Sequence, residues 1–240
     1  MAKFLIVIPT YNERESIAKV LNALNAESSK NDICVLVVDD GSPDGTAEYV
    51  DSLSLSFVTV LRRKEKSGLG ASYRAGFAWG LQRSEFTHFV SMDGDGSHRA
   101  SDFSLMANEV DGTDLVLGSR WMPGGAIVNW PKYREMISRT GTAYATRVLN
   151  LRISDITGGF KIYSRELLER IDINSITSEG YCFQIEMVMA AADSGAIITE
   201  VPITFVEREA GRSKMSQAIV VEALWKTTLW GLRRRLSIRR

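Results

Sequence analysis

Apolar runs of strand length alternate with helical segments through the first half of the chain, and this alternation restricts its fold more than any other feature. Residues 4–8 and 33–38 are unbroken apolar runs rich in branched side chains, which suits strands buried on both faces of a parallel sheet. In residues 13–26 the apolar positions instead recur every three to four residues, as in a helix. The alternation therefore predicts an α/β fold, mainly a parallel doubly wound sheet with helices on both faces.

The remaining elements follow from the same patterns. We expect further strands at 57–62, 87–92 and 114–118, and further helices at 44–53, 69–82 and 101–110. The second half is less regular, with an expected loop at 120–133, helices at 134–150 and 179–194, a short strand between those helices, a strand at 197–202, a loop at 207–214 and a terminal helix. We therefore expect one domain over residues 1–214 and a helical appendage over residues 215–240.

Composition excludes several classes of protein. Hydrophobic residues make up 45% and charged residues 24%, which is typical of a folded protein. Basic and acidic residues are equal at 29 each, so no overall positive charge attracts nucleic acid, and we expect no nucleic-acid partner. Cys34 and Cys182 have no metal-ligand spacing and are predicted to be buried thiols in a reducing compartment. Without a signal peptide or an apolar stretch of about 18 residues, the chain is expected on the cytoplasmic side.

A pair of carboxylates ends the strand expected at 87–92. Asp93 and Asp95 stand one residue apart in the segment MDGDGSH, and two hard oxygen ligands at a strand end suit Mg²⁺ or Mn²⁺ carried in on a nucleoside diphosphate. The alternative is that Asp-Gly pairs merely form turns. An EF-hand is excluded because Ser104 occupies its twelfth position. His98 could be a ligand, a proton shuttle or a helix cap, and we favour the cap.

A second acidic cluster, DDGSPDGT at residues 39–46, follows the strand expected at 33–38. Carboxylates there could accept hydrogen bonds from a base or a ribose. A turn and a helix cap would explain the later residues, but not two acids directly after an apolar strand. Residues 68–70 (GLG) could present backbone amides to a phosphate, although tight helix packing is the more economical interpretation. No P-loop, dinucleotide glycine motif or nucleophile elbow is present.

Together these segments resemble the inverting, nucleotide-sugar-dependent family 2 glycosyltransferases of the GT-A fold. The resemblance rests on IPTYNERE (8–15), VVDDGSPDGT (37–46), GLG (68–70) and DGD (93–95). Later segments are similar to dolichyl- or polyprenyl-phosphate mannose synthases, namely GSR (118–120), DITGGF (155–160), EVPITFVER (200–208) and GRSK (211–214). The resemblance covers about residues 4–216.

The resemblance also implies roles for individual residues. It places the nucleotide pocket at Pro9, Tyr11, Glu13, Val38 and Asp40. The carboxylates of Glu13 and Asp40 would contact the guanine and the ribose. It places the diphosphate beside Asp93, Gly94 and Asp95, and Mg²⁺ or Mn²⁺ would be held by Asp93 and Asp95. Ser97 would be a third metal ligand, at a position where some relatives have a glutamine. Arg120 and Arg134 would hold the lipid phosphate, while Arg208 and Lys214 would close over the donor. The implied catalytic residues are Asp95, Arg120, Arg134 and Lys214.

The implied reaction is mannose transfer from GDP-mannose to a polyprenyl phosphate with inversion. A phosphate monoester is already a nucleophilic anion near neutral pH, so positioning and charge neutralisation should dominate over general-base catalysis. The alternatives are transfer of glucose from UDP-glucose to the same lipid and a non-catalytic nucleotide-sugar-binding subunit. A nucleotidyltransferase would also use a parallel sheet and Mg²⁺, but it needs a glycine-rich phosphate loop early in the chain.

The C-terminal segment differs from the rest in charge. From Arg208 onward nine basic residues stand against two acidic ones. Apolar residues and tryptophans recur at helical spacing before the run Arg233, Arg234 and Arg235, a pattern typical of a helix lying on an anionic membrane surface. A core-packing helix with a basic tail is the alternative. We expect peripheral membrane attachment without a spanning helix, and a membrane-protein partner is compatible with that position.

Overall fold

The computed structural model describes residues 2–207 and 217–237, and within them the chain forms a seven-stranded sheet in the order β3-β2-β1-β4-β7-β5-β8. Its strands are β1 (Lys3–Thr10), β2 (Asp32–Asp39), β3 (Val58–Arg62), β4 (His88–Ser91), β5 (Leu115–Ser119), β7 (Lys161–Ser164) and β8 (Ile198–Pro202). All neighbouring pairs are parallel except those of β7, which is antiparallel to β4 and β5. The predicted mainly parallel α/β sheet is confirmed.

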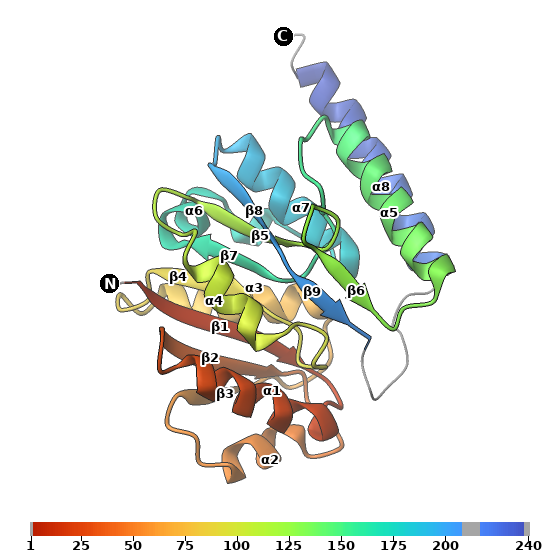
Figure 1. Cartoon of the computed structure of the whole chain (residues 1–240). Helices are drawn as coiled ribbons and strands as arrows, with labels where there is room; N and C mark the ends of the chain where they lie inside the picture. Colours follow the sequence, from red (N-terminus) through yellow and green to blue (C-terminus); the bar gives the residue numbers. More distant parts are fainter. Residues whose placement is uncertain (1, 208–216, 238–240) are drawn as a thin grey trace.

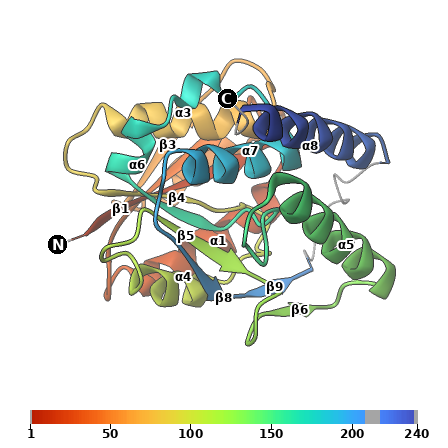
Figure 2. The ribbon, with the colours of Figure 1, turned by 90° about the horizontal axis from the view of Figure 1, so that it is seen from above.

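Helices cover both faces of this sheet (Figures 1 and 2). They are α1 (Arg14–Glu27), α2 (Thr46–Ser52), α3 (Leu69–Leu81), α4 (Ala100–Ala107), α5 (Lys132–Leu149), α6 (Arg165–Arg170), the 3₁₀ turn η1 (Ile173–Ser175), α7 (Gly180–Asp193) and α8 (Gln217–Ser237). α1, α2 and α4 pack on one face, and α3, α6 and α7 pack on the other. The sequence patterns missed α6 and η1, because segments this short carry little periodicity.

Side-chain alternation along β1 explains the two cores. Phe4, Ile6 and Ile8 enter the core shared with α1 and α4. Leu5 and Val7 enter the core shared with α3 and α7. Successive side chains of a strand point to opposite faces, so an unbroken apolar run serves both layers at once.

The register of the parallel strands brings the polar clusters of the sequence to one edge of the sheet. Thr10 at the end of β1 pairs with Asp39 at the end of β2, and β4 continues into Asp93 on the other side of β1. Carboxyl ends of parallel strands share an edge, which is the usual position of ligands in such sheets. Because β7 is antiparallel, this edge receives the segment that precedes β7, residues 155–160, rather than the one that follows it.

Two small features complete the fold beside this edge. β6 (Ala126–Val128) pairs with β9 (Thr204–Val206) in a separate two-stranded sheet, so the expected loop at 120–133 contains a strand. α8 packs against α5 and α7 (Figure 1), and Tyr144 of α5 and Thr228 of α8 are joined by a hydrogen bond of 2.6 Å. Among the helices of the described residues, none has the length and apolar character that crossing a membrane requires.

Two helical glycines allow a matched test of the packing. A Cβ at Gly80 of α3 would lie 2.4 Å from Leu5 Cδ2 and 2.5 Å from Phe89 Cε1, whereas a Cβ at Gly141 of α5 would meet nothing within 4 Å. We expect Gly80→Ala to lower the free energy of unfolding by about 1–3 kcal/mol through overpacking. Gly141→Ala should raise it by about 0.5–1 kcal/mol through helix propensity. Urea denaturation measures both, and equal effects would contradict this packing.

Candidate functional site

A cavity of about 330 Å³ lies at the edge of the sheet where the parallel strands end. The predicted site residues that line it are Pro9, Tyr11, Glu13, Asp40, Asp93, Gly94, Asp95, Arg120 and Arg134. Val38 and Ser97 do not line it, and Arg208 and Lys214 lie outside the described residues. The lining also includes residues that sequence reasoning did not single out, among them Lys66, Trp130, Thr157, Glu179, Gln184 and Phe205. One cavity thus brings together the acidic and the basic halves of the predicted site.

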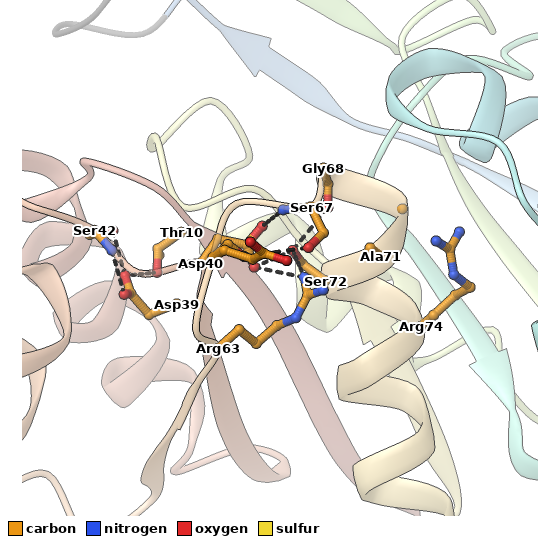
Figure 3. A network of polar contacts seen from close by, with 12 residues as sticks. Thr10, Asp39, Asp40, Ser42, Arg63, Ser67, Gly68, Ala71, Ser72 and Arg74 are labelled. Atoms are coloured by element: carbon orange, nitrogen blue, oxygen red, sulfur yellow. Dashed lines mark hydrogen bonds and ion pairs between the residues drawn. The ribbon is translucent and has the colours of Figure 1, made fainter.

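The two neighbouring acids at the end of β2, Asp39 and Asp40, have different surroundings (Figure 3). Asp39 accepts hydrogen bonds from the Thr10 hydroxyl at 3.0 Å and from the backbone amide of Ser42 at 2.9 Å, so it holds the turn after β2. Asp40 accepts from Arg63 at 2.7 Å and from Ser72 at 2.8 Å, and it lines the cavity. Asp39 therefore stabilises the turn, while Asp40 is held in place at the cavity wall.

Aromatic and cationic groups stand at the β1 end of the cavity. Tyr11 follows β1, and the Lys66 ammonium lies 4.0 Å from the centre of its ring, a cation–π contact. Glu13, just before α1, accepts a hydrogen bond from Ser16 at 3.1 Å. This wall offers a flat ring, an ammonium group and a carboxylate, the groups that a base, a phosphate and a ribose require.

The carboxylate pair after β4 lines the middle of the cavity. Tyr73, fully buried in α3, donates a hydrogen bond of 3.4 Å to Asp93 Oδ1, and burial followed by the nearby Asp93 charge raises the pKa of Tyr73 well above its ordinary value. The phenol therefore stays a donor at neutral pH. Asp95 accepts from the Ser97 backbone amide at 3.0 Å, which closes the turn and orients its carboxylate.

The predicted helix-cap role of His98 is wrong. α4 begins at Ala100 with Arg99 as its N-cap residue, and no side chain caps it by a hydrogen bond. His98 is buried instead, stacked on Phe160, and its Nδ1 accepts from the Asp93 backbone amide at 3.1 Å. Burial lowers the pKa of His98 despite the nearby carboxylates, so the ring is a neutral support behind Asp93.

Ser97 and Val38 lie behind the cavity wall rather than in it. The Ser97 hydroxyl is buried and has no hydrogen-bond partner among the described residues. Val38 is buried in the core that β2 shares with α3. The Val38 side chain therefore belongs to the core, and Asp40, two residues later, is the residue that lines the cavity.

Arg120 is held by a buried ion pair. Its side chain is 5% exposed, and it donates to the fully buried Asp155 through Nε at 2.6 Å and through a terminal nitrogen at 2.8 Å. Burial alone would raise the pKa of Asp155, but the Arg120 guanidinium outweighs it and holds that pKa below its ordinary value. Thr157 accepts a further hydrogen bond of 3.0 Å from Arg120. A guanidinium fixed this way presents its charge to the cavity at one position.

Arg134 reaches the cavity from the first turn of α5. Its guanidinium lies 4.1 Å from the centre of the Trp130 ring and pairs with Glu207. Its Nε is buried without a hydrogen-bond partner among the described residues. Arg120 also lies 5.7 Å from the centre of the Trp130 ring, so both guanidinium groups are near the same indole. Two cations in one pocket favour an anion that both can share.

The amides of the GLG segment are used within the protein. Glu179 accepts from the Gly70 amide at 2.7 Å and from the Arg74 side chain at 2.9 Å. A Cβ at Gly70 would lie 2.5 Å from the carbonyl oxygen of Ser178, so tight packing explains this glycine. The N-terminus of α3 therefore holds the Glu179 carboxylate, and tight packing accounts for Gly70, while Gly68 and Leu69 line the cavity.

A buried lysine that sequence reasoning missed lies behind the cavity. Lys161, the first residue of β7, donates to the Gly158 carbonyl and to the side-chain oxygen of Gln184. Burial lowers the pKa of Lys161 to about 7, against the opposing effect of Asp155. A lysine that begins an apolar strand carries no motif, and only the antiparallel direction of β7 places it at this edge.

Comparisons with known proteins agree with this geometry. The profile of Glycosyl transferase family 2 matches residues 5–172. A polyprenol monophosphomannose synthase of Mycolicibacterium smegmatis is 46% identical over 97% of this chain and 88% of its own length. An undecaprenyl-phosphate mannosyltransferase of Micrococcus luteus is 47% identical over 96% of this chain and 94% of its own length.

Solved structures share the fold at low sequence identity. Glucosyl-3-phosphoglycerate synthase from Mycobacterium tuberculosis, in complex with Mn²⁺, UDP and glucosyl-3-phosphoglycerate, superposes with a TM-score of 0.69 at 19% identity. The superposition covers 96% of this chain and 80% of the other. The same enzyme with UDP alone gives a TM-score of 0.67. This likeness extends beyond the family match at residue 172, so the whole described architecture has a counterpart.

The Arg120–Asp155 pair predicts a large effect on stability. Asp155→Asn would leave the buried Arg120 charge uncompensated, so we expect the free energy of unfolding to fall by about 3–5 kcal/mol. Glu169→Gln is the control, since it removes a carboxylate from the exposed Arg165–Glu169 pair and should change stability by less than about 0.5 kcal/mol. Urea denaturation measures both. Equal losses in the two variants would show that Asp155 does not hold Arg120.

Proposed function

The chain belongs to glycosyl transferase family 2, and from this premise we propose that it transfers mannose from GDP-mannose to a polyprenyl phosphate. Glycosyltransferase activity and the GT-A type of α/β fold follow from the family itself. One observation carries the finer assignment: a single cavity holds Asp93 and Asp95 together with two buried arginines. The names of the two relatives support mannose as the sugar and a lipid phosphate as the acceptor.

The donor nucleotide would occupy the β1 and β2 end of the cavity. Asp40 and Glu13 offer carboxylates for the amino and hydroxyl groups of guanine and ribose, and Tyr11 offers a ring face. Lys66 lies close enough to Tyr11 to add positive charge beside the diphosphate. The predicted contacts of Arg208 and Lys214 with the donor remain part of this proposal, outside the described residues.

The donor set fits a divalent cation. Asp93 and Asp95 both line the cavity and offer hard carboxylate oxygens, while the diphosphate and water would supply the other ligands that Mg²⁺ or Mn²⁺ requires. Ser97 would serve as a third protein ligand only with its buried hydroxyl turned toward the cavity. Such a cation neutralises charge on the departing nucleoside diphosphate. Mn²⁺ bound with UDP in the glucosyl-3-phosphoglycerate synthase supports this assignment.

The acceptor phosphate would lie between Arg120 and Arg134. Arg120 keeps its buried partner Asp155 and therefore a fixed position. A phosphate monoester carries its own negative charge, so the residues around it need only position it for attack on the anomeric carbon. Attack in line with the departing diphosphate inverts that carbon. Arg120 and Arg134 would orient the attacking oxygen, and Asp95 would orient the leaving group.

A membrane-facing surface would let this pocket reach a lipid. On the first turns of α5, Tyr133, Met136 and Ile137 are exposed beside Arg134 at helical spacing. On α8 the exposed large apolar residues are Val221, Leu224, Trp225, Leu232 and Leu236. Trp230, by contrast, packs against the core. α8 therefore uses one side for packing and offers the other to a membrane, followed by basic residues that suit anionic headgroups.

The two sugar donors are distinguished by direct assay. We expect wild-type protein to transfer labelled mannose from GDP-mannose to a short polyprenyl phosphate, and to transfer less glucose from UDP-glucose. Asp95→Asn should reduce transfer by at least about 100-fold, because charge on the leaving group is no longer neutralised. Asp111→Asn, an exposed carboxylate after α4, is the control and should be unaffected.

Two outcomes would change the assignment. Full transfer by Asp95→Asn would exclude the proposed role of the acidic pair. Equal transfer of glucose from UDP-glucose would remove the sugar assignment and leave the lipid phosphate acceptor in place.

Membrane attachment is tested by sedimentation with vesicles containing anionic lipid. We expect binding of the wild-type protein to fall as salt rises, since the attraction is partly electrostatic. The double variant Arg233→Gln, Arg235→Gln should bind more weakly, by about 1 kcal/mol for each charge removed. Lys30→Gln, at the end of α1 across the sheet, is the control. Binding insensitive both to salt and to the arginine substitutions would contradict attachment through α8.

A further inference from the structure

Three polar groups of the cavity wall lack a hydrogen-bond partner among the described residues: Arg134 Nε, Trp130 Nε1 and Gln184 Nε2. Only Gln184 is an amide. Gln184 lies in the second turn of α7, lines the cavity and is 2% exposed. Its Nε2 is buried and makes no hydrogen bond within the described part of the chain. Leaving a buried donor unpaired costs about 1–3 kcal/mol, so such a group in a cavity wall indicates a missing acceptor.

The orientation of this amide is fixed from behind. Lys161 donates to Gln184 Oε1 and to the Gly158 carbonyl, so the oxygen of the amide must face the lysine. Lys161 does not line the cavity, whereas Gln184 does. With its oxygen engaged on the far side, the amide has only Nε2 left to offer the cavity. The neighbouring Phe183 stacks on Tyr73 at 5.7 Å, which holds α7 against α3.

Gln184 stands between the two charged ends of the site. Lys161 binds the carbonyl of Gly158, and the chain at this point connects the two ends. At the arginine end, a Cβ at Gly158 would lie 3.6 Å from the carboxylate of Asp155, the partner of Arg120. At the acidic end, a Cβ at Gly159 would lie 3.5 Å from the Asp93 carboxylate. On the proposed function, the diphosphate lies at the acidic end and the acceptor phosphate at the arginine end. The group transferred between them is the sugar, whose polar groups are uncharged hydroxyls. A neutral amide donor suits a hydroxyl oxygen, whereas the phosphates already have cationic partners.

We propose that Gln184 is a specificity-determining residue that donates a hydrogen bond from Nε2 to one hydroxyl group of the transferred sugar, and that Lys161 is a positioning residue that fixes this donor. The inference rests on the proposed function for the order of the groups in the cavity. It adds to that function a contact that discriminates between sugars. A site built to bind a hydroxyl rejects an analogue that lacks it, because its own polar group is then left unpaired.

Deoxy donors test the contact. Wild-type protein is assayed with GDP-mannose and with analogues that each lack one sugar hydroxyl, and one analogue should lose about 10- to 100-fold in kcat/KM, the cost of one unpaired neutral donor. Gln184→Met should lower kcat/KM for GDP-mannose by a similar factor. In this variant the critical deoxy analogue should have the same kcat/KM as GDP-mannose. Affinity for GDP alone, measured by calorimetry, should be unchanged. Equal deoxy penalties in wild type and variant would overturn the proposal, and a matching loss of GDP affinity would assign the contact to a phosphate oxygen instead.

A second substitution separates the lost donor from damage to the fold. Gln184→Glu keeps the size of the side chain and an acceptor for Lys161, but it removes the amide N–H groups. It should reproduce the loss even where Gln184→Met proves unstable, and full activity in a folded Gln184→Glu protein would overturn the proposal. Met189→Leu, on the same helix against the core, is the matched control and should keep wild-type kinetics.

Lys161→Met tests the positioning role. Without the ammonium group the amide of Gln184 can turn over, so the penalty for the critical deoxy donor should shrink by several-fold in the folded variant. A merely structural lysine would lower activity with all donors equally and leave that penalty intact, which would overturn its role. If wild-type protein uses another nucleotide sugar and not GDP-mannose, the proposed function fails, and the same deoxy series on that sugar still decides the role of Gln184.

Discussion

The buried ion pair of Arg120 and Asp155 is the interaction on which the rest of the site depends. It joins the end of β5 to the segment before β7. That segment passes beside Asp93 at Gly159, and its Gly158 carbonyl accepts a hydrogen bond from Lys161. Two charges removed from water are stable only while both are present and their hydrogen bonds are satisfied. Three backbone or side-chain contacts between Arg120 and Asp155 meet that requirement. The position of the cationic end of the cavity is thereby tied to that of the acidic end.

The parallel half of the site could be predicted from the sequence, and the antiparallel part could not. Asp40, Asp93 and Arg120 each follow an apolar run, so parallel strands must bring them to one edge, and the structure places all three in one cavity. β7 is antiparallel to its neighbours β4 and β5, and the direction of a strand cannot be predicted from the pattern of residues within it. The residues before β7, from Asp155 to Phe160, therefore entered the prediction only through the likeness of the DITGGF segment to a family, without individual roles, and Lys161 was missed.

The other missed residues share a different cause. Glu179 and Gln184 lie at the start of an apolar helix, where the sequence pattern predicts that a polar residue is a helix cap or is exposed. Their roles arise from α3, whose Gly70 amide binds Glu179, and from β7, whose Lys161 binds Gln184. Such contacts join residues far apart in the chain, and spacing alone predicts only which residues are neighbours within one element. His98 was misjudged for the same reason, since its burial is set by Phe160 and Phe205.

The two arginines of the cavity differ in how firmly their partners hold them. Asp155 is fully buried, so it cannot leave Arg120 without exposing a charge to an apolar core. The Glu207 side chain is 26% exposed, so its charge is less enclosed than that of Asp155 and it holds Arg134 less firmly. The acceptor phosphate that we propose would therefore meet one fixed cation and one whose partner is held less firmly. In this proposal a phosphate would replace the Glu207 carboxylate as the anionic partner of Arg134, while Arg120 would supply the geometric reference for the attacking oxygen.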